Sequence, residues 1–215
     1  MSPLVLFPEE TIVVAPAYCG SIDYYARMAA FGHVVINPNI RFDRHDHTAR
    51  RCEIVGTSGR LKLSVPTKKL PAGNNTVANL EVDFILDWRR NHWGAFYSAY
   101  GRSPFFDYYA DRFHAIYQQQ FARLIDYDLA LDSIIRPIIG IETDVRVLAA
   151  GESADISTDI STDICTDILP TIADVEYYQV WRDRHGFQSR LSVLDLIFNL
   201  GPESPLLIKK MLKGE

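Results

Sequence analysis

The chain has 215 residues, of which 47% are hydrophobic and 23% are charged, as in an ordinary water-soluble globular protein. This length predicts one domain, or one domain with an appended subdomain. The formal net charge of −5 does not favour a nucleic-acid partner, and no apolar run approaches the roughly 18 residues of a membrane span. The three cysteines are odd in number and widely spaced, and the first residues lack the basic start of a secretory signal. We therefore expect a cytoplasmic protein without a disulfide framework.

The opening residues predict a strand, a helix and a second strand. TIVVA is a short apolar run of strand-forming residues, Ser21 is a suitable N-cap for a helix that runs to about Phe31, and HVVIN follows as a buried strand. This order indicates an α/β fold with a partly parallel or mixed sheet. The connecting loop, APAYCGSID, lacks both GxGxxG and the P-loop lysine. The helix start could still hold an anion, and Cys19 beside it could act as a nucleophile, although no partner histidine is defined.

A β-hairpin is predicted next, because CEIV and LKLSV flank the turn sequence GTSG. Pro66 then limits the second strand to a sheet edge or a strand end. After the loop LPAGNNT, the alternating sequence LEVDFI predicts a further strand.

The rest of the chain is mainly helical in its pattern. Asp87 can cap a helix over about 88–101, and Ser103 followed by Pro104 is a typical helix start, with the helix reaching about Leu124. A third helix is expected from about 128 to 139. A terminal helix over about 190–199 should end at NLGPES, where glycine and proline supply the stop.

Residues 151–176 hold seven acidic side chains and no lysine or arginine. They include the tetrapeptide repeat DISTDISTDICTDI, which we interpret as a low-complexity, mobile insertion. A short helix with an isoleucine stripe and an acidic cation-binding loop are the alternatives. The chain is thereby divided into an α/β core with a helical portion (1–150), the acidic insertion (151–176) and a C-terminal helical segment that packs on the core (177–215).

The sequence NHWGAFYSAYGRSPFFDYY is unusually aromatic. Its first rings fall at helical spacing in one stripe of Trp93, Phe96, Tyr97 and Tyr100. A second apolar stripe on the next helix begins in this block and consists of Phe106, Tyr109, Phe113 and Ile116. Packing between two helices explains most of the phenylalanine and tryptophan side chains. Buried tyrosine hydroxyls need partners, however, so a pocket between these helices would be lined by rings with polar tips, which suits a sugar or a nucleotide base.

Several polar residues are candidates for the chemistry of such a pocket. His92 is the best candidate for a general base, because its ordinary pKa is near neutrality. Arg102, Ser103 and the free backbone N–H groups after Pro104 could form an anion site. Arg51, at the start of the hairpin, could face a phosphate or a carboxylate. For each of them a purely structural role is the competing interpretation.

A metal pair is conceivable at His45 and His47, which share one face of an extended strand with Asp43. No third ligand is obvious, and we predict no metal and no cofactor.

Five blocks of the sequence together resemble the WbqC-like protein family: PAYCGSIDYYARMA, RRCEI, LKLSVPTKK, NHWGAFYSAYGRSPFFDYY and YYQVWRDRHGFQSRLSVLDLIFNLGPES. They occur in the family's order and cover most of the chain. The residues that match the family pattern directly are Tyr24, Tyr25, Ser64, Val65, Pro66, His92, Trp93, Tyr100, Ser103, Pro104, Phe105 and Phe106. Cys19 stands where the family commonly has an aromatic residue, RHDHTAR replaces a stretch rich in lysine and glutamine, and the tetrapeptide repeat is not part of the pattern.

The resemblance implies a role in the biosynthesis of bacterial O-antigen or other surface polysaccharides. The function we predict is a transferase that acts on an activated sugar or a sugar-linked precursor, preferably by acyl or aminoacyl transfer. His92 would be its base, and the substrate would be bound by Tyr24, Tyr25, Arg51, Trp93, Tyr97, Tyr100, Arg102 and Ser103. The expected partner is a small sugar or nucleotide sugar, and the oligomeric state is not predicted. A non-catalytic binding or scaffold protein of the same pathway and a nucleotidyltransferase are the alternatives.

Overall fold

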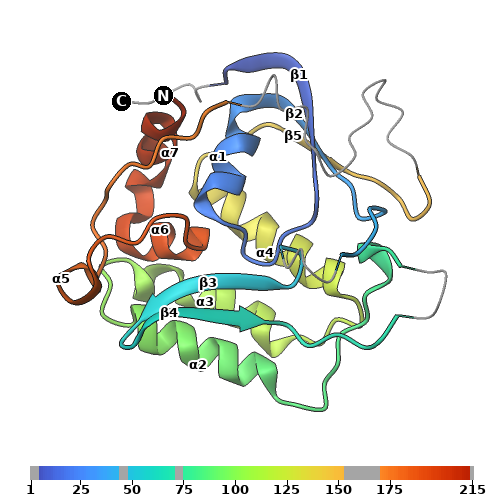
Figure 1. Cartoon of the computed structure of the whole chain (residues 1–215), viewed down its shortest axis with the longest axis horizontal. Coiled ribbons are helices and arrows are strands. Elements are labelled where there is room, and N and C mark those ends of the chain that lie inside the picture. The colour runs from blue at the N-terminus through green and yellow to red at the C-terminus, as the bar shows by residue number, and fades with distance from the viewer. Residues whose placement is uncertain (1–4, 44–47, 71–74, 153–169, 214–215) are drawn as a thin grey trace.

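A computed structural model of the chain describes residues 5–43, 48–70, 75–152 and 170–213. Its β-structure consists of a three-stranded sheet and a separate two-stranded hairpin, and helices fill the space between and around them (Figure 1). The predicted α/β class, with a parallel sheet, a hairpin and a mainly helical C-terminal half, is confirmed. Over the described ranges, no helix is both long enough and apolar enough to cross a membrane. The acidic repeat and the pair His45 and His47 lie outside the described residues.

The three-stranded sheet is parallel throughout, with β1 (Phe7–Val14), β2 (Phe31–Ile36) and β5 (Asp144–Val147) in the order β1-β2-β5. Helix α1 (Ile22–Ala30) connects the first two strands and is capped by Ser21, whose Oγ accepts a hydrogen bond from the Tyr24 amide. The predicted strand–helix–strand start is therefore confirmed. Strand β5 was not predicted, because its four residues, DVRV, are too few and too polar to give a strand pattern.

The hairpin consists of β3 (Arg51–Gly56) and β4 (Gly59–Ser64), and it confirms the prediction from CEIV and LKLSV. Gly59, which follows the two turn residues and pairs with Gly56, has a φ of +98°, a conformation that glycine adopts without strain. The strand predicted from LEVDFI is wrong. Residues 77–79 form the short helix η1 (Val77–Asn79), and the chain after it makes only isolated bridges, from Glu81 to Arg123 and from Val82 to Thr67. Each neighbour runs alongside for one residue only, so no ladder forms.

Three longer helices follow: α2 (Trp88–Tyr100), α3 (Phe106–Gln118) and α4 (Leu124–Ile138). Asp87 caps α2 as predicted, because its Oδ1 accepts from the Arg90 amide. The start predicted for α3 at Ser103 is wrong.

The Ser103 hydroxyl and amide both donate to the Tyr100 carbonyl, at 2.6 and 2.7 Å. Ser103 therefore closes the turn that ends α2 and does not cap α3, which begins three residues later. Helix α4 starts earlier than predicted, at Leu124, whose amide donates to the Leu80 carbonyl.

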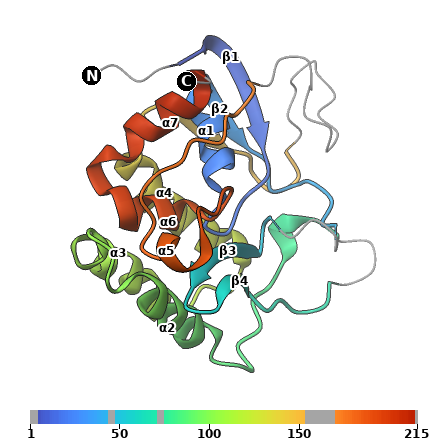
Figure 2. The same cartoon turned by 60° about the vertical axis from the view of Figure 1, so that its left-hand side comes forward.

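The C-terminal segment contains α5 (Arg182–His185), α6 (Val193–Leu200), η2 (Gly201–Glu203) and α7 (Ser204–Lys213). Helix α6 ends before Gly201 as predicted, and the φ of +51° at that glycine explains the stop. Helix α7 was missed, since Gly-Pro ends one helix without preventing another. In Figures 1 and 2, α7 lies beside α1, and α6 lies beside α2, α3 and the hairpin.

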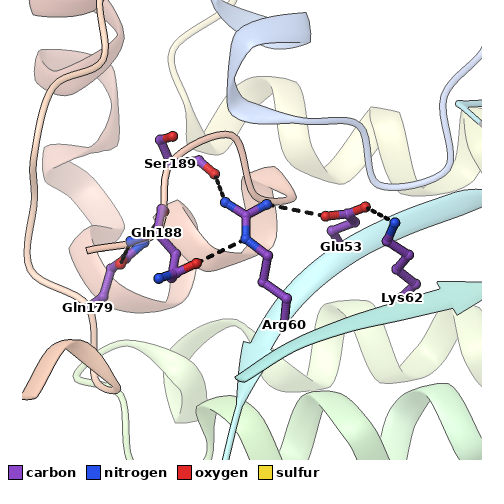
Figure 3. A network of polar contacts seen from close by, with 6 residues as sticks. All are labelled: Glu53, Arg60, Lys62, Gln179, Gln188 and Ser189. Atoms are coloured by element: carbon purple, nitrogen blue, oxygen red, sulfur yellow. Dashed lines mark hydrogen bonds and ion pairs between the residues drawn. The ribbon is translucent and has the colours of Figure 1, made fainter. Parts of the chain in front are cut away.

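A network of polar contacts fastens the hairpin to the C-terminal segment (Figure 3). The Arg60 guanidinium on β4 donates to Gln188 Oε1 at 2.9 Å and to the Ser189 carbonyl at 2.7 Å, and it pairs with Glu53 at 3.2 Å. Gln179 and Gln188 exchange backbone and side-chain hydrogen bonds beside it. Two segments more than 100 residues apart are thereby held in one orientation.

Candidate functional site

The loop at the carboxyl end of β1 is buried and fixed from several sides. Tyr18 and Cys19 have no exposed surface, and Cys19 has a φ of +44°, in the left-handed region that residues other than glycine rarely adopt. The Ser192 hydroxyl donates to the Cys19 carbonyl at 2.8 Å, and the Tyr18 amide donates to the Thr48 carbonyl at 3.1 Å. These contacts from distant segments hold the strained conformation in place.

His92 on α2 points at this loop and joins a chain of buried hydroxyl groups. The Tyr18 hydroxyl lies 2.7 Å from His92 Nδ1 and 2.7 Å from the hydroxyl of Tyr117 on α3. The Tyr117 hydroxyl in turn lies 3.8 Å from Cys19 Sγ, within the distance of a sulfur hydrogen bond. Trp88 packs edge-on against the imidazole. Residues from a loop and two helices thus form one continuous polar chain inside an apolar core.

The imidazole of His92 is held in its neutral form. Its side chain is almost completely buried, and this burial lowers its pKa from 6.5 to about 4, although a hydrogen bond to the Ser64 backbone acts in the opposite direction. In the tautomer whose proton is on Nε2, Nδ1 accepts from the Tyr18 hydroxyl. With that tautomer, the protons of the chain can point from Cys19 through Tyr117 and Tyr18 to His92.

A buried carboxyl group lies beside the same loop. Asp128 on α4 is 2% exposed, and neither of its oxygens has a hydrogen-bond partner. Burial raises the pKa of Asp128 well above its usual value, and the proximity of Cys19 and then of Asp132 raises it further. Unpartnered buried oxygens are costly, at about 1–3 kcal/mol for each group. Asp128 is therefore a buried carboxyl group whose surroundings favour its neutral form, and its hydrogen-bonding capacity is unused.

The other predicted residues near the hairpin and α1 are largely occupied by structural contacts. The Tyr24 hydroxyl donates to the Ala15 carbonyl at 2.8 Å, and Tyr25 is fully buried, with its hydroxyl close to Asp132. Arg51 donates from Nε to the Ser64 hydroxyl at 2.8 Å. The backbone of Ser64 also contacts His92, so Arg51 is connected to the polar chain through Ser64.

The predicted aromatic wall is divided between the interior and the surface. Trp93 stacks on His114 with ring centroids 4.5 Å apart, and Tyr97 is 64% exposed. Tyr100 is fully buried, and its ring packs against Phe198 of α6.

Tyr100 belongs to a second buried polar cluster around Asp195 of α6. Asp195 Oδ2 accepts from the Tyr177 hydroxyl at 2.5 Å and from Gln179 at 2.9 Å. Neither Asp195 Oδ1 nor the Tyr100 hydroxyl has a hydrogen bond of normal geometry, yet the two lie close enough for Tyr100 to lower the pKa of Asp195. The larger effect is burial, which leaves that pKa raised to about 6.

The structure does not bring Arg102 and Ser103 to His92. They lie ten and eleven positions further along the chain, just past the C-terminal end of α2, and about 12 Å of helix separates His92 from that end. Arg102 is exposed there, and Ser103 is buried against the end of α2. The proposed anion site and the proposed base are therefore at opposite ends of one helix.

Reasoning from the sequence missed the partners of His92. Neither Tyr18 nor Tyr117 was among the predicted site residues. No local pattern could have identified them, because Tyr18 lies 74 residues from His92 and 99 residues from Tyr117 in the chain. Within the ranges that the structure describes, no group of three or more His, Cys, Asp or Glu side chains is placed to hold a metal ion.

These features define an α/β protein with a parallel three-stranded sheet and a buried polar chain at the carboxyl end of its first strand. A model of the WbqC-like protein family matches residues 15–171, which is most of the chain, and the protein belongs to that family. The resembling block that begins at Tyr177 lies beyond the matched residues. Comparisons with curated proteins and with solved structures gave no match.

Proposed function

We propose that this protein is a transferase of bacterial surface-polysaccharide biosynthesis, which moves an acyl or aminoacyl group onto an amino or hydroxyl group of an activated sugar. Membership of the WbqC-like family supports the pathway. The reaction class is supported by a neutral imidazole at the end of a buried hydroxyl chain, since acyl transfer requires a group that takes a proton from the attacking atom.

The observation that carries the proposal is the contact of Tyr18 with His92 and Tyr117. Two consecutive distances of 2.7 Å make a proton path in a region from which water is excluded. The path starts at the carboxyl end of a parallel strand and next to a helix start, which is where ligands bind in open α/β sheets. His92 accepts the proton at Nδ1, and Tyr18 relays it.

Binding of the substrate is proposed at the rim of this chain. Arg51 lies beside Ser64, which contacts His92, and supplies a positive charge for a phosphate or a carboxylate. Tyr24 is half-buried at the start of α1 and supplies a ring edge and a hydroxyl.

A second candidate function is that of a binding protein of the same pathway, and the outer face of α2 favours it. Tyr97 exposes most of its ring, and Trp93 forms a flat stack with His114. Exposed rings with polar tips bind the faces of sugars and bases. Arg102, just past the C-terminal end of the same helix, would then hold a phosphate of a nucleotide sugar.

Assays of acyl transfer distinguish the two functions. Nucleotide-linked amino sugars are incubated with acyl thioesters or acyl phosphates, and the acylated sugar is measured by mass spectrometry. A transferase forms the product, and His92→Asn should reduce its rate by about 10²–10⁴-fold while the melting temperature shows that the variant is folded.

His114→Asn is the matched control, because it removes an imidazole from the neighbouring helix and leaves the polar chain intact. Stabilisation by a nucleotide sugar without product formation, and loss of that stabilisation in Tyr97→Ala, would instead identify a binding protein. A ligand at 100 times its Kd should add about 2.7 kcal/mol to the free energy of unfolding.

A further inference from the structure

Cys19 has a backbone conformation that its surroundings impose. Its φ of +44° is strained for a residue other than glycine, yet the chain has Cys19 at this position and glycine at the next. The residue stands in the loop between the end of β1 and α1, two residues before the N-cap Ser21, and its side chain is fully buried.

The thiol is directed at the open end of the hydrogen-bond chain. Cys19 Sγ lies 3.8 Å from the Tyr117 hydroxyl, which passes to the Tyr18 hydroxyl and then to His92 Nδ1. With Nδ1 as the acceptor, the Tyr18 hydroxyl donates to His92 and the Tyr117 hydroxyl donates to Tyr18. The Tyr117 oxygen can then accept one further hydrogen bond, and the S–H group of Cys19 is placed to donate it.

A second and independent feature indicates that a ligand group belongs here. Asp128 is 2% exposed and has two oxygens without a partner, and Cys19 is the neighbour that acts on it most strongly. A neutral carboxyl group in this position can donate one hydrogen bond to an oxygen atom. The carbonyl oxygen of an acyl group bonded to Cys19 would provide that acceptor.

We propose that Cys19 is the residue that carries the transferred acyl group, as a thioester, and that Asp128 donates a hydrogen bond to the acyl oxygen. This inference rests on the proposed transferase function and names its covalent intermediate. The donor is an acyl thioester or an acyl phosphate.

The first half of the reaction forms the thioester. Cys19 Sγ attacks the acyl carbon as its proton moves to Tyr117, the Tyr117 proton moves to Tyr18, and the Tyr18 proton moves to His92 Nδ1. The bond from the acyl carbon to the donor's leaving group then breaks. The proton returns along the same chain to the leaving group, which departs in its protonated form.

The second half transfers the acyl group to the sugar. An amine or hydroxyl of the acceptor attacks the thioester carbon, the C–S bond breaks, and the sulfur of Cys19 takes up one proton as the acceptor loses one. The sum of both halves exchanges the leaving group for the acceptor, and the enzyme is unchanged.

Entry of the donor requires movement of a side chain, because Cys19 is fully covered. Tyr24 lies across the loop, since a Cβ atom on Gly20 would stand 2.8 Å from its ring and its hydroxyl donates to the Ala15 carbonyl. Tyr24 is itself half-buried, and a movement that breaks its contact with Ala15 would uncover the loop. A small acyl donor is therefore the appropriate probe.

The test uses the full chain with p-nitrophenyl acetate and, separately, with acetyl phosphate. The burst of p-nitrophenolate, the intact mass and the peptide that carries the acetyl group are measured. We expect one acetyl group per chain, on Cys19. Cys52→Ser is the control for the other buried thiol of the described residues, which hydrogen-bonds with Cys19, and this variant should keep the acetyl group on Cys19.

Cys19→Ser should abolish the thioester adduct, and Cys19→Gly provides a second variant that tolerates the positive φ if the first does not fold. Tyr117→Phe interrupts the chain and should slow acetylation by about 10²–10⁴-fold. Asp128→Asn should slow it as well, since an amide is a weaker donor to the developing negative charge.

Three outcomes separate this inference from the proposed function. An acetyl group found only on other residues, or an unchanged burst in both Cys19 variants, overturns the role of Cys19. If Cys19→Ser acylates a nucleotide-linked amino sugar at the wild-type rate, the role of Cys19 fails and the transferase function stands. If Cys19 is acetylated but no sugar is acylated by the wild-type protein, the thioester stands and the proposed function fails.

Discussion

Replacing His92 with asparagine should remove part of the acid sensitivity of the fold. The pKa of this imidazole is lowered from 6.5 to about 4 because the side chain is buried. Since the folded protein binds the proton less readily than the unfolded chain, the neutral ring contributes its full stability above about pH 6.5, and that stability is lost as the pH falls toward 4. The difference between the two pKa values corresponds to about 3 kcal/mol of unfolding free energy, because a tenfold difference in proton affinity is worth about 1.4 kcal/mol.

Asparagine keeps an acceptor for the Tyr18 hydroxyl and cannot be protonated in this range. Urea unfolding of the wild type and of His92→Asn at about pH 7.5 and about pH 4.5 gives the cost of the substitution at each pH. That cost should be smaller by about 2.5 kcal/mol at the lower pH. Comparing the two proteins cancels the carboxyl groups that titrate in both.

Tyr18→Phe is the control. It removes the hydroxyl that contacts Nδ1 but leaves the imidazole buried, so it should keep most of the acid-induced loss that the wild type shows. An equal cost of His92→Asn at both pH values would refute the conclusion that this ring is neutral because it is buried.

Three further predictions concern parts of the fold away from the polar chain. Burial raises the pKa of Asp195 to about 6, so the stability that its protonated form contributes is lost as the pH rises. The unfolding free energy of Asp195→Asn, measured with urea, should therefore gain about 1 kcal/mol relative to that of the wild type between about pH 5 and about pH 8. Gly32→Ala should cost at least about 2 kcal/mol of unfolding free energy, since its Cβ would stand 1.8 Å from the Pro8 carbonyl oxygen. Gly94→Ala, in open space on α2, should instead stabilise the protein by up to about 1 kcal/mol. Equal effects of the two substitutions would contradict the close approach of β1 to β2. Ser21→Ala should lower the melting temperature through a loss of about 1 kcal/mol, because α1 loses its cap, and an unchanged melting temperature would show that the cap is not needed.

Local sequence determined the elements whose boundaries depend on neighbouring residues. Ser21 and Asp87 cap their helices through side-chain contacts that span three residues, and the hairpin turn needs only its own glycines. Such signals act at short range, so they can be read without knowledge of the fold. The helical stripe of rings on α2 and α3 was readable for the same reason, and it correctly indicated that the two helices pack on each other.

Tertiary structure decided which of these residues share an environment. Ser103 has the sequence of a helix cap, but its hydroxyl donates to the Tyr100 carbonyl at the end of α2. The partners of His92 come from a loop and a helix that are distant in sequence, and the strained loop at Cys19 is held by the contacts of Ser192 with Cys19 and of Thr48 with Tyr18. Sequence order contains no information on the meeting of such segments, because burial and hydrogen bonding between them are set only when the core closes.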